Sequence, residues 1–187
     1  MKKIITLLFL LVSLTMFSQI PTEFTLTKEG LTPFVVTTVQ DKTQAEIYTK
    51  TLEWVNKTFK EPSEVIKATV QNDYVRIEVF TAAVYATKLL GVTAYTDLKY
   101  QIEVSAKDNR YKFEVLDIQF YVEGSSATVA GWRTLVNETN VEYWHKKDGT
   151  IKPRFIDLKD KLPKLFNSTN QELKSFIESN NSQKNDW

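Results

Sequence analysis

The chain has 187 residues and carries 24 Lys and Arg against 23 Asp and Glu, with one His and no Cys. The absence of Cys excludes disulfides, iron–sulfur clusters, thiol catalysis and lipid attachment to an N-terminal Cys. A single His excludes a histidine-rich metal site, and the near-neutral balance gives no general attraction to nucleic acid or anionic lipid.

Residues 1–18 are predicted to be a cleaved secretory signal peptide. Lys2 and Lys3 give the positive start, residues 4–17 carry no charge, and the small residue Ser18 follows. The alternative is a membrane anchor, but this apolar run is short against the roughly 20 residues needed to cross hydrocarbon. No later segment is apolar for long enough to span a membrane. We therefore expect an exported protein, in the periplasm or secreted.

Residues 19–32 are expected to form a loosely held polar leader before a folded core over residues 33–122. The core starts with residues 33–39, which read PFVVTTV and predict a strand. Its Pro occupies the first position, where the missing N–H is tolerated.

A helix is predicted next, with Asp41 or Thr43 as its N-cap. Thr43 and Glu46 fit a capping box, in which each side chain bonds the other residue's backbone N–H. Pro62 ends the helix. The apolar residues expected on its buried face, spaced three and four apart, are Ala45, Tyr48, Leu52, Val55 and Phe59. The expected ion pairs on the opposite side are Glu46–Lys50 and Glu53–Lys57.

Four further strands are predicted, and tight turns join them in pairs. Asn72-Asp73 separates the first two in a turn that tolerates positive φ, and residues 107–109 separate the last two. Residues 82–95 are ambiguous and are interpreted as a linking segment. The strands cover residues 65–71, 74–80, 96–105 and 110–122.

The last of these strands changes parity along its length. The apolar residues at 111, 113 and 115 share one face, whereas those at 116, 118 and 120 share the other. The change requires a β-bulge, or a strand that crosses between two burial environments. We favour a bulge between Val115 and Leu116.

Residues 123–187 are expected to form a C-terminal extension whose helices pack on the core. Periodicity does not decide whether residues 132–147 form a short helix or a strand. A helix that begins near Ile156 is expected to break or kink at Pro163, and residues 167–169 to cap a last helix. The remaining segments are a loop at 123–130, a turn at 148–149 and a frayed end at 180–186.

The predicted order is strand, helix, four antiparallel strands and then helices. Strands that are segregated from helices and joined as hairpins indicate an α+β domain with two layers. One face of the sheet is apolar, and the helix at 43–59 together with the C-terminal helices is the expected cover for it.

The chain also resembles a known family over residues 33–122. The segments that carry the resemblance are AEIYTKTLEWVNKTFKEPSEVIKATVQNDYVRIEVF and YTDLKYQIEVSAKDNRYKFEVLDI, and the run KKDG at 146–149 is similar as well. The family consists of exported Bacteroidota proteins and is described as a domain of unknown function with a TATA-box-binding-protein-like fold. The resemblance implies a curved antiparallel sheet with helices on one face, and it supplies no activity or site residues.

The residues argue against a nucleic-acid partner, although the fold name suggests one. A nucleic-acid-binding sheet needs clustered Lys and Arg on its exposed face. Here the outward positions mix signs, as in Arg76 with Glu78, Lys99 with Glu103 and Lys112 with Glu114. Such ladders stabilise neighbouring strands and weaken attraction to phosphate.

No residue is assigned a catalytic, metal-binding or cofactor-binding role. His145 is the only His available to a Ser–His–Asp triad, no GxSxG motif accompanies it, and we expect a surface or half-buried side chain. The carboxylate pairs Asp157/Asp160 and Glu114/Asp117 are compatible with glycoside chemistry, but pairs this close in sequence are common on solvated faces.

Aromatic residues are the most suggestive feature for function. Tyr74 and Phe80 fall on the polar face of their strand, and Trp132, Tyr143 and Trp144 cluster later in the chain. We expect the C-terminal helices or residues 82–95 to cover them; exposed together, they would bind a polymer or a protein.

The leading hypothesis is a non-catalytic envelope or secreted module that binds a protein or an envelope component. The alternatives are an extracytoplasmic hydrolase that uses loop carboxylates, and a structural accessory without a ligand.

Overall fold

The computed structural model describes residues 20–89, 91–126, 128–134 and 145–179. Its centre is a six-stranded antiparallel sheet in the order β3-β7-β6-β5-β4, with β8 beside β7. The strands are β3 (Phe34–Thr38), β4 (Ile66–Val70), β5 (Tyr74–Leu89), β6 (Val92–Lys107), β7 (Arg110–Val122) and β8 (Gly131–Thr134). The helices are α2 (Gln44–Thr58), α3 (Pro62–Val65), the 3₁₀ turn η2 (Pro153–Phe155) and α5 (Ile156–Glu178).

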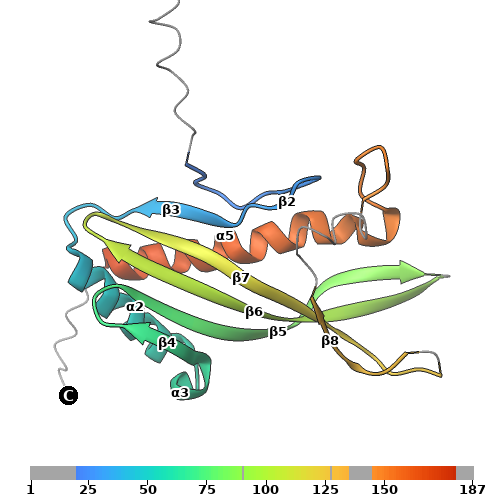
Figure 1. Ribbon diagram of the computed structural model, residues 1–187, viewed down its shortest axis with the longest axis horizontal. Helices are drawn as coiled ribbons and strands as arrows, with labels where there is room; N and C mark the ends of the chain where they lie inside the picture. Colours follow the sequence, from blue (N-terminus) through green and yellow to red (C-terminus); the bar gives the residue numbers. More distant parts are fainter. Residues whose placement is uncertain (1–19, 90, 127, 135–144, 180–187) are drawn as a thin grey trace, which may run out of the picture.

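Helices α2 and α5 lie against one face of the sheet and against each other (Figure 1). The side chains between the two layers form one hydrophobic core, to which the strands contribute alternate residues. In the described part of the chain no helix covers the opposite face, which we call the open face. These layers confirm the predicted α+β class with helices on one side of an antiparallel sheet.

Helix α2 has the predicted cap, and its buried face matches the prediction in part. The Thr43 hydroxyl accepts from the Glu46 N–H, and the Glu46 carboxylate accepts from the Thr43 N–H at 2.8 Å, which confirms the capping box. The fully buried residues are Ile47, Thr51, Trp54 and Val55, whereas Ala45 is exposed. Val55 is buried as predicted, and Tyr48, Leu52 and Phe59 are partly buried against the core. The apolar residues occupy more than one stripe, so spacing alone did not select the most buried one. Lys50 pairs with Glu53 at 2.8 Å rather than with Glu46.

The predicted loose leader is wrong for residues 24–32. Phe24 is 1% exposed and Leu26 is 6% exposed, and both belong to the core. The segment forms a small ribbon of β1 (Leu26–Thr27) and β2 (Gly30–Leu31), and β1 contacts α5. Two buried side chains amid polar neighbours do not produce a periodic signal, and therefore sequence reading missed them.

The hairpin of β4 and β5 is confirmed, with Asn72 at a φ of +60° in its connection. The linking segment predicted over residues 82–95 is wrong, because these residues extend β5 and begin β6 as one long arm. The ladder is interrupted at Ala83, whose φ is +54° and whose N–H bonds the Asp97 carboxylate at 2.8 Å. This interruption breaks the alternation that would have identified the strand.

The predicted bulge in β7 is confirmed. Val115 pairs with Ile102 and Asp117 pairs with Gln101, so Leu116 is the extra residue. Leu116 is 42% exposed, as expected for a residue outside the ladder. The bulge exchanges the faces of odd and even positions along the rest of β7.

Helix α5 runs without a break through Pro163, which corrects the prediction of two helices. Asn167 does not act as a cap, because its side-chain amide bonds both the N–H and the carbonyl of Phe24. One continuous stripe faces the core and holds the helix against the sheet despite the lost backbone bond. The stripe consists of Leu158, Leu162, Phe166, Asn170, Leu173 and Ile177.

The segment left open at residues 132–147 begins as strand β8. Residues 135–144, with Tyr143 and Trp144, lie outside the described residues, as do residues 1–18 and 180–187. The helices that the structure describes include none with the length and apolar character of a membrane span.

Candidate functional site

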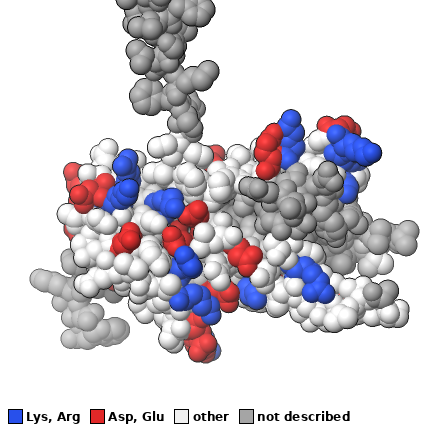
Figure 2. Space-filling view, in the orientation of Figure 1, with Lys and Arg blue, Asp and Glu red and all other residues white. Residues whose placement is uncertain are grey.

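The open face of the sheet carries charges of both signs. Ion pairs on this face join Arg76 to Glu103 at 2.7 Å, Lys67 to Glu78 at 3.6 Å, and Lys112 to Glu114. Figure 2 shows blue and red side chains interspersed over this part of the molecule. Paired charges of this kind produce no continuous positive stripe across the strands. The absence of a nucleic-acid partner stays a prediction.

Three aromatic rings gather on the open face where β8 joins the sheet. We call Phe80, Tyr121 and Trp132 the aromatic cluster. The Trp132 ring centre lies 6.2 Å from that of Phe80 and 5.4 Å from that of Tyr121, both in edge-to-face geometry. The Lys99 ammonium lies 4.9 Å from the Trp132 ring centre, which is within cation–π range. The Trp132 indole is therefore in contact with Phe80, Tyr121 and Lys99.

Strand register explains why these residues meet. Tyr121 pairs with Trp132 on β8, and Phe80 pairs with Lys99 on β6. The bulge at Leu116 sets the direction of Tyr121: before it, positions 111 and 113 of β7 are buried, whereas after it the buried position is 118. Tyr121 therefore reaches the open face only because β7 contains one extra residue.

The aromatic cluster is open to solvent. Phe80 is 59% exposed and Tyr121 is 37% exposed, whereas Trp132 is half-buried. The expectation that the C-terminal helices or residues 82–95 cover these rings is wrong for Phe80. The long arm continues past Phe80 in the plane of the sheet, and α5 lies on the other face, so neither shields the ring.

The other aromatic residues singled out in the sequence are not part of the cluster. Tyr74 is half-buried at the start of β5, where the Arg76 guanidinium lies 5.7 Å from its ring centre. Sequence reading found Phe80 and Trp132 but missed Tyr121 and Lys99. The sequence pattern places Lys99 on the polar face of its strand. Only the register across three strands shows that it reaches the indole of Trp132.

His145 is 6% exposed, so the predicted surface or half-buried position is wrong. It forms an isolated β-bridge with Ile151, across the turn that follows it. A hydrolytic triad would need this imidazole beside a nucleophile and a carboxylate. Among the described residues, no group of three His, Asp or Glu side chains is arranged to hold a metal ion.

Three of the four carboxylates in the two pairs proposed from sequence bond other groups of the domain. Asp157 accepts the backbone N–H of Ala86 at 3.0 Å and ties α5 to the long arm. Glu114 pairs with Lys112, and Asp117 accepts from the Gln119 side chain at 2.7 Å. Asp160 is exposed on α5. These contacts give each of the three bonded carboxylates a structural role.

A family model described as a domain of unknown function (DUF4468) with TBP-like fold matches residues 35–121. The chain carries a DUF4468 domain. The matched range runs from β3 into the end of β7 and includes α2, so it confirms the resemblance noted in the sequence. The aromatic cluster lies at the end of this range, because Tyr121 is its last residue and Trp132 follows it.

Two solved structures are similar to this chain, and the first of them supports the same fold. A DUF4468 family protein from Bacteroides ovatus has 15% sequence identity and a TM-score of 0.56, with 80% of this chain and 87% of that chain covered. A TBP-like protein from Parabacteroides distasonis has 14% identity and a TM-score of 0.49, with 77% and 87% covered. Identity at this level speaks for the fold alone. No curated protein matches the chain.

Proposed function

We propose that this DUF4468 domain is an exported, non-catalytic binding module that docks another protein on the aromatic cluster. The exposure of Phe80 beside Trp132 and Tyr121 carries the proposal. Large apolar rings cost free energy when they face water, and a contiguous group of them on a folded surface is typical of a binding site.

The composition of the cluster favours a protein partner. Trp and Tyr supply most binding hot spots at protein interfaces, where a few rings dominate the affinity. Contacts with Phe80, Tyr121 and Lys99 already restrict the Trp132 indole, so less side-chain entropy is lost when a partner binds. Polar side chains accompany the rings, since Gln119 lies on β7 two residues before Tyr121 and pairs with Lys99.

The alternative of a hydrolase receives less support from the same residues. A general acid and a base must both face the substrate. Asp157 instead bonds the long arm, Glu114 pairs with a lysine, and His145 is only 6% exposed. Exposed aromatic rings are not needed in a structural accessory without a ligand. The docking test below distinguishes such an accessory from a binding module.

Export is tested with the full chain in a Gram-negative host. We expect a periplasmic protein whose first residue, determined by mass spectrometry, lies near Gln19. Arginine within the apolar run opposes membrane insertion, so Leu8→Arg with Leu10→Arg should leave the chain uncleaved in the cytoplasm. A wild-type protein that keeps Met1 and stays in the cytoplasm would contradict the export step.

Docking is tested by removing the rings. Phe80→Ala with Trp132→Ala should abolish capture of a partner that the mature wild-type domain enriches from envelope fractions. Once that partner is purified, we expect its Kd to rise at least about a hundredfold, because two hot-spot rings each contribute about 2 kcal/mol or more. Isothermal titration calorimetry measures the change.

The matched control removes exposed apolar side chains elsewhere. Tyr95 is 69% exposed on the long arm and Ile156 is 60% exposed at the start of α5, and neither belongs to the cluster. Tyr95→Ala with Ile156→Ala should bind like the wild type. Equal binding by the cluster variant and the wild type, with both folded by circular dichroism, would refute docking at this site.

A further inference from the structure

A second surface feature lies away from the open face, at the turn before α5. The turn is closed by backbone bonds from the Lys146 N–H to the Thr150 carbonyl at 2.7 Å and from the Gly149 N–H to the Lys146 carbonyl at 2.9 Å. Gly149 has a φ of +81°, a conformation that residues with a side chain rarely adopt. The Asp148 carboxylate accepts from the Thr150 N–H and hydroxyl at 2.9 and 2.6 Å. The turn therefore has a defined shape.

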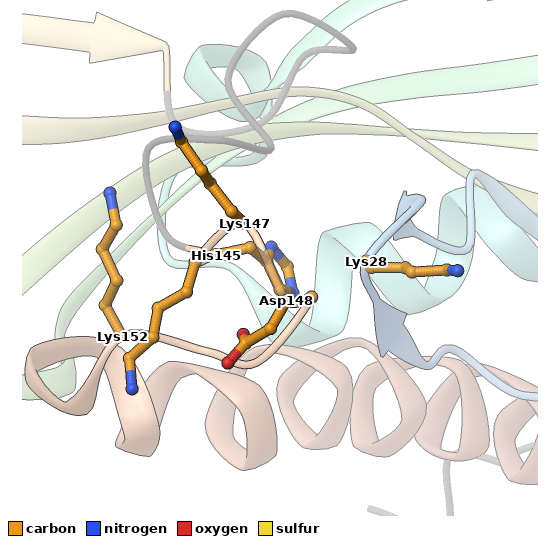
Figure 3. Close-up of a pocket in the computed structure, with 7 residues that line it drawn as sticks. Lys28, His145, Lys147, Asp148 and Lys152 are labelled. Atoms are coloured by element: carbon orange, nitrogen blue, oxygen red, sulfur yellow. The ribbon is translucent and has the colours of Figure 1, made fainter.

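A hollow of about 610 Å³ opens beside this turn (Figure 3). Its lining includes Lys28, His145, Lys146, Lys147, Asp148 and Lys152. Figure 3 shows Lys147 and Lys152 extending to the same side of the turn, whereas Lys28 extends the other way. Lys28 comes from the N-terminal ribbon, and its Cδ lies 3.6 Å from where a Cβ on Gly149 would be. Two distant parts of the chain thus meet here.

The hollow concentrates positive charge. Among the described residues that line it are four lysines and one carboxylate, that of Asp148, and Lys28 also pairs with the Glu29 carboxylate at 3.6 Å. Hydrogen bonds from Thr150, first through its side chain, lower the pKa of the Asp148 carboxyl, so it is ionised and already engaged. Among the described residues, neither Lys146 nor Lys147 lies within 4 Å of a carboxylate, in contrast to the paired lysines of the open face. The near-neutral total charge of the chain does not reveal this local excess of positive charge.

We infer that the hollow binds a phosphoryl group carrying more than one negative charge. An ammonium offers three N–H donors and a full charge, and charge-assisted bonds to phosphate are stronger than neutral ones. Several lysines around one hollow fit a compact oxyanion, whereas a nucleic-acid strand needs a longer basic stripe. The phosphoryl group belongs to a soluble compound or to a lipid headgroup. The site uses no residue of the aromatic cluster and is independent of protein docking.

Two probes separate these sources. Inorganic pyrophosphate is titrated into the protein by calorimetry, and vesicles of about four parts phosphatidylcholine to one part phosphatidic acid are tested by co-sedimentation. Lys146→Ala with Lys147→Ala should weaken binding of the effective probe at least about tenfold, since it removes two ammonium groups that would donate charge-assisted hydrogen bonds to the phosphoryl oxygens. Lys60→Ala with Lys107→Ala removes the same charge from exposed lysines and should change binding less than about twofold.

Each outcome supports or overturns the inference. Saturable binding of pyrophosphate without vesicle binding supports a soluble phosphate compound, and vesicle binding without pyrophosphate supports a lipid headgroup. Binding of both supports the phosphoryl site itself. Equal losses of binding in the two double variants would overturn the inference, because the attraction would then follow net charge. Absence of binding of both probes to the wild type would overturn it as well. Thermal unfolding verifies that both variants fold.

Discussion

Replacing Phe24 by Ala should lower the free energy of unfolding by about 3–5 kcal/mol, the range for a buried Phe reduced to Ala. The ring is 1% exposed and lies edge-on to Phe113 at 5.8 Å and against Phe166 at 5.6 Å between ring centres. Its partners belong to β7 and α5, so the lost ring leaves a cavity between the two layers of the domain. Urea denaturation followed by tryptophan fluorescence measures the change.

The backbone around Phe24 should keep its place in this variant. The Asn167 side chain bonds the Phe24 N–H at 2.8 Å and its carbonyl at 3.0 Å, and neither bond uses the ring. Ile20→Ala, in the same segment but at a side chain that is 56% exposed, is the control and should cost less than about 0.5 kcal/mol. Equal stabilities of the two variants would show that residues 20–32 are the loose leader first expected.

The elements that sequence reading found are those with local causes. The capping box of Thr43 and Glu46 specifies where α2 begins without reference to the rest of the fold. The parity change at Leu116 is visible in the sequence because it follows from the side-chain period of a strand. Hairpin turns at Asn72 and Asn109 are local as well, and both residues have positive φ.

The errors arise where distant residues decide the structure. Phe24 is buried because it packs against α5, which lies more than a hundred residues later in the chain. Asn167 of that helix bonds Phe24 instead of capping a helix. Ala83 interrupts a ladder that only the full pairing of β5 with β6 reveals. No local pattern contains this information, since each case depends on a partner that the sequence does not place.

The two candidate sites differ in how far sequence could identify them. Phe80 and Trp132 were recognised as aromatic residues in polar surroundings, but their contact depends on strand β8, for which periodicity left helix and strand open. The hollow joins Lys28 to the turn at Lys146 and Lys147 across more than a hundred residues. Overall charge argued against an anionic ligand because it averages over the whole chain.

Replacing Asn170 by Leu should destabilise the domain by about 2–4 kcal/mol, although the two side chains have similar size. Asn170 is 8% exposed in the stripe of α5 that faces the sheet. Its side-chain amide donates to the Thr37 hydroxyl at 2.9 Å, and its Oδ1 accepts from the Tyr111 hydroxyl at 2.8 Å. Leucine would leave two buried hydroxyls without these partners, and its added apolar burial offsets only part of that cost.

A double-mutant cycle separates this network from simple packing. Tyr111→Phe alone should cost about 1 kcal/mol, because it removes the hydroxyl that bonds Oδ1 of Asn170 at 2.8 Å and its backbone carbonyl at 3.1 Å. In the Asn170→Leu background the same change should cost less, since the hydroxyl there keeps only the backbone carbonyl of residue 170, at 3.1 Å, from its bonds to that residue. Additive losses across the cycle, measured by urea denaturation, would mean that the hydroxyl and the amide do not depend on each other.

Alkaline pH gives the network a second readout. Burial raises the pKa of the Tyr111 phenol, and its hydrogen bonding does not offset this effect. A folded-state pKa above the unfolded value of about 10 means that the folded protein retains a proton that the unfolded chain loses. This contribution is complete below about pH 10 and is lost as the pH rises toward the folded pKa. Wild-type stability should therefore fall more steeply above pH 10 than that of Tyr111→Phe, and parallel curves would place the phenol in contact with solvent.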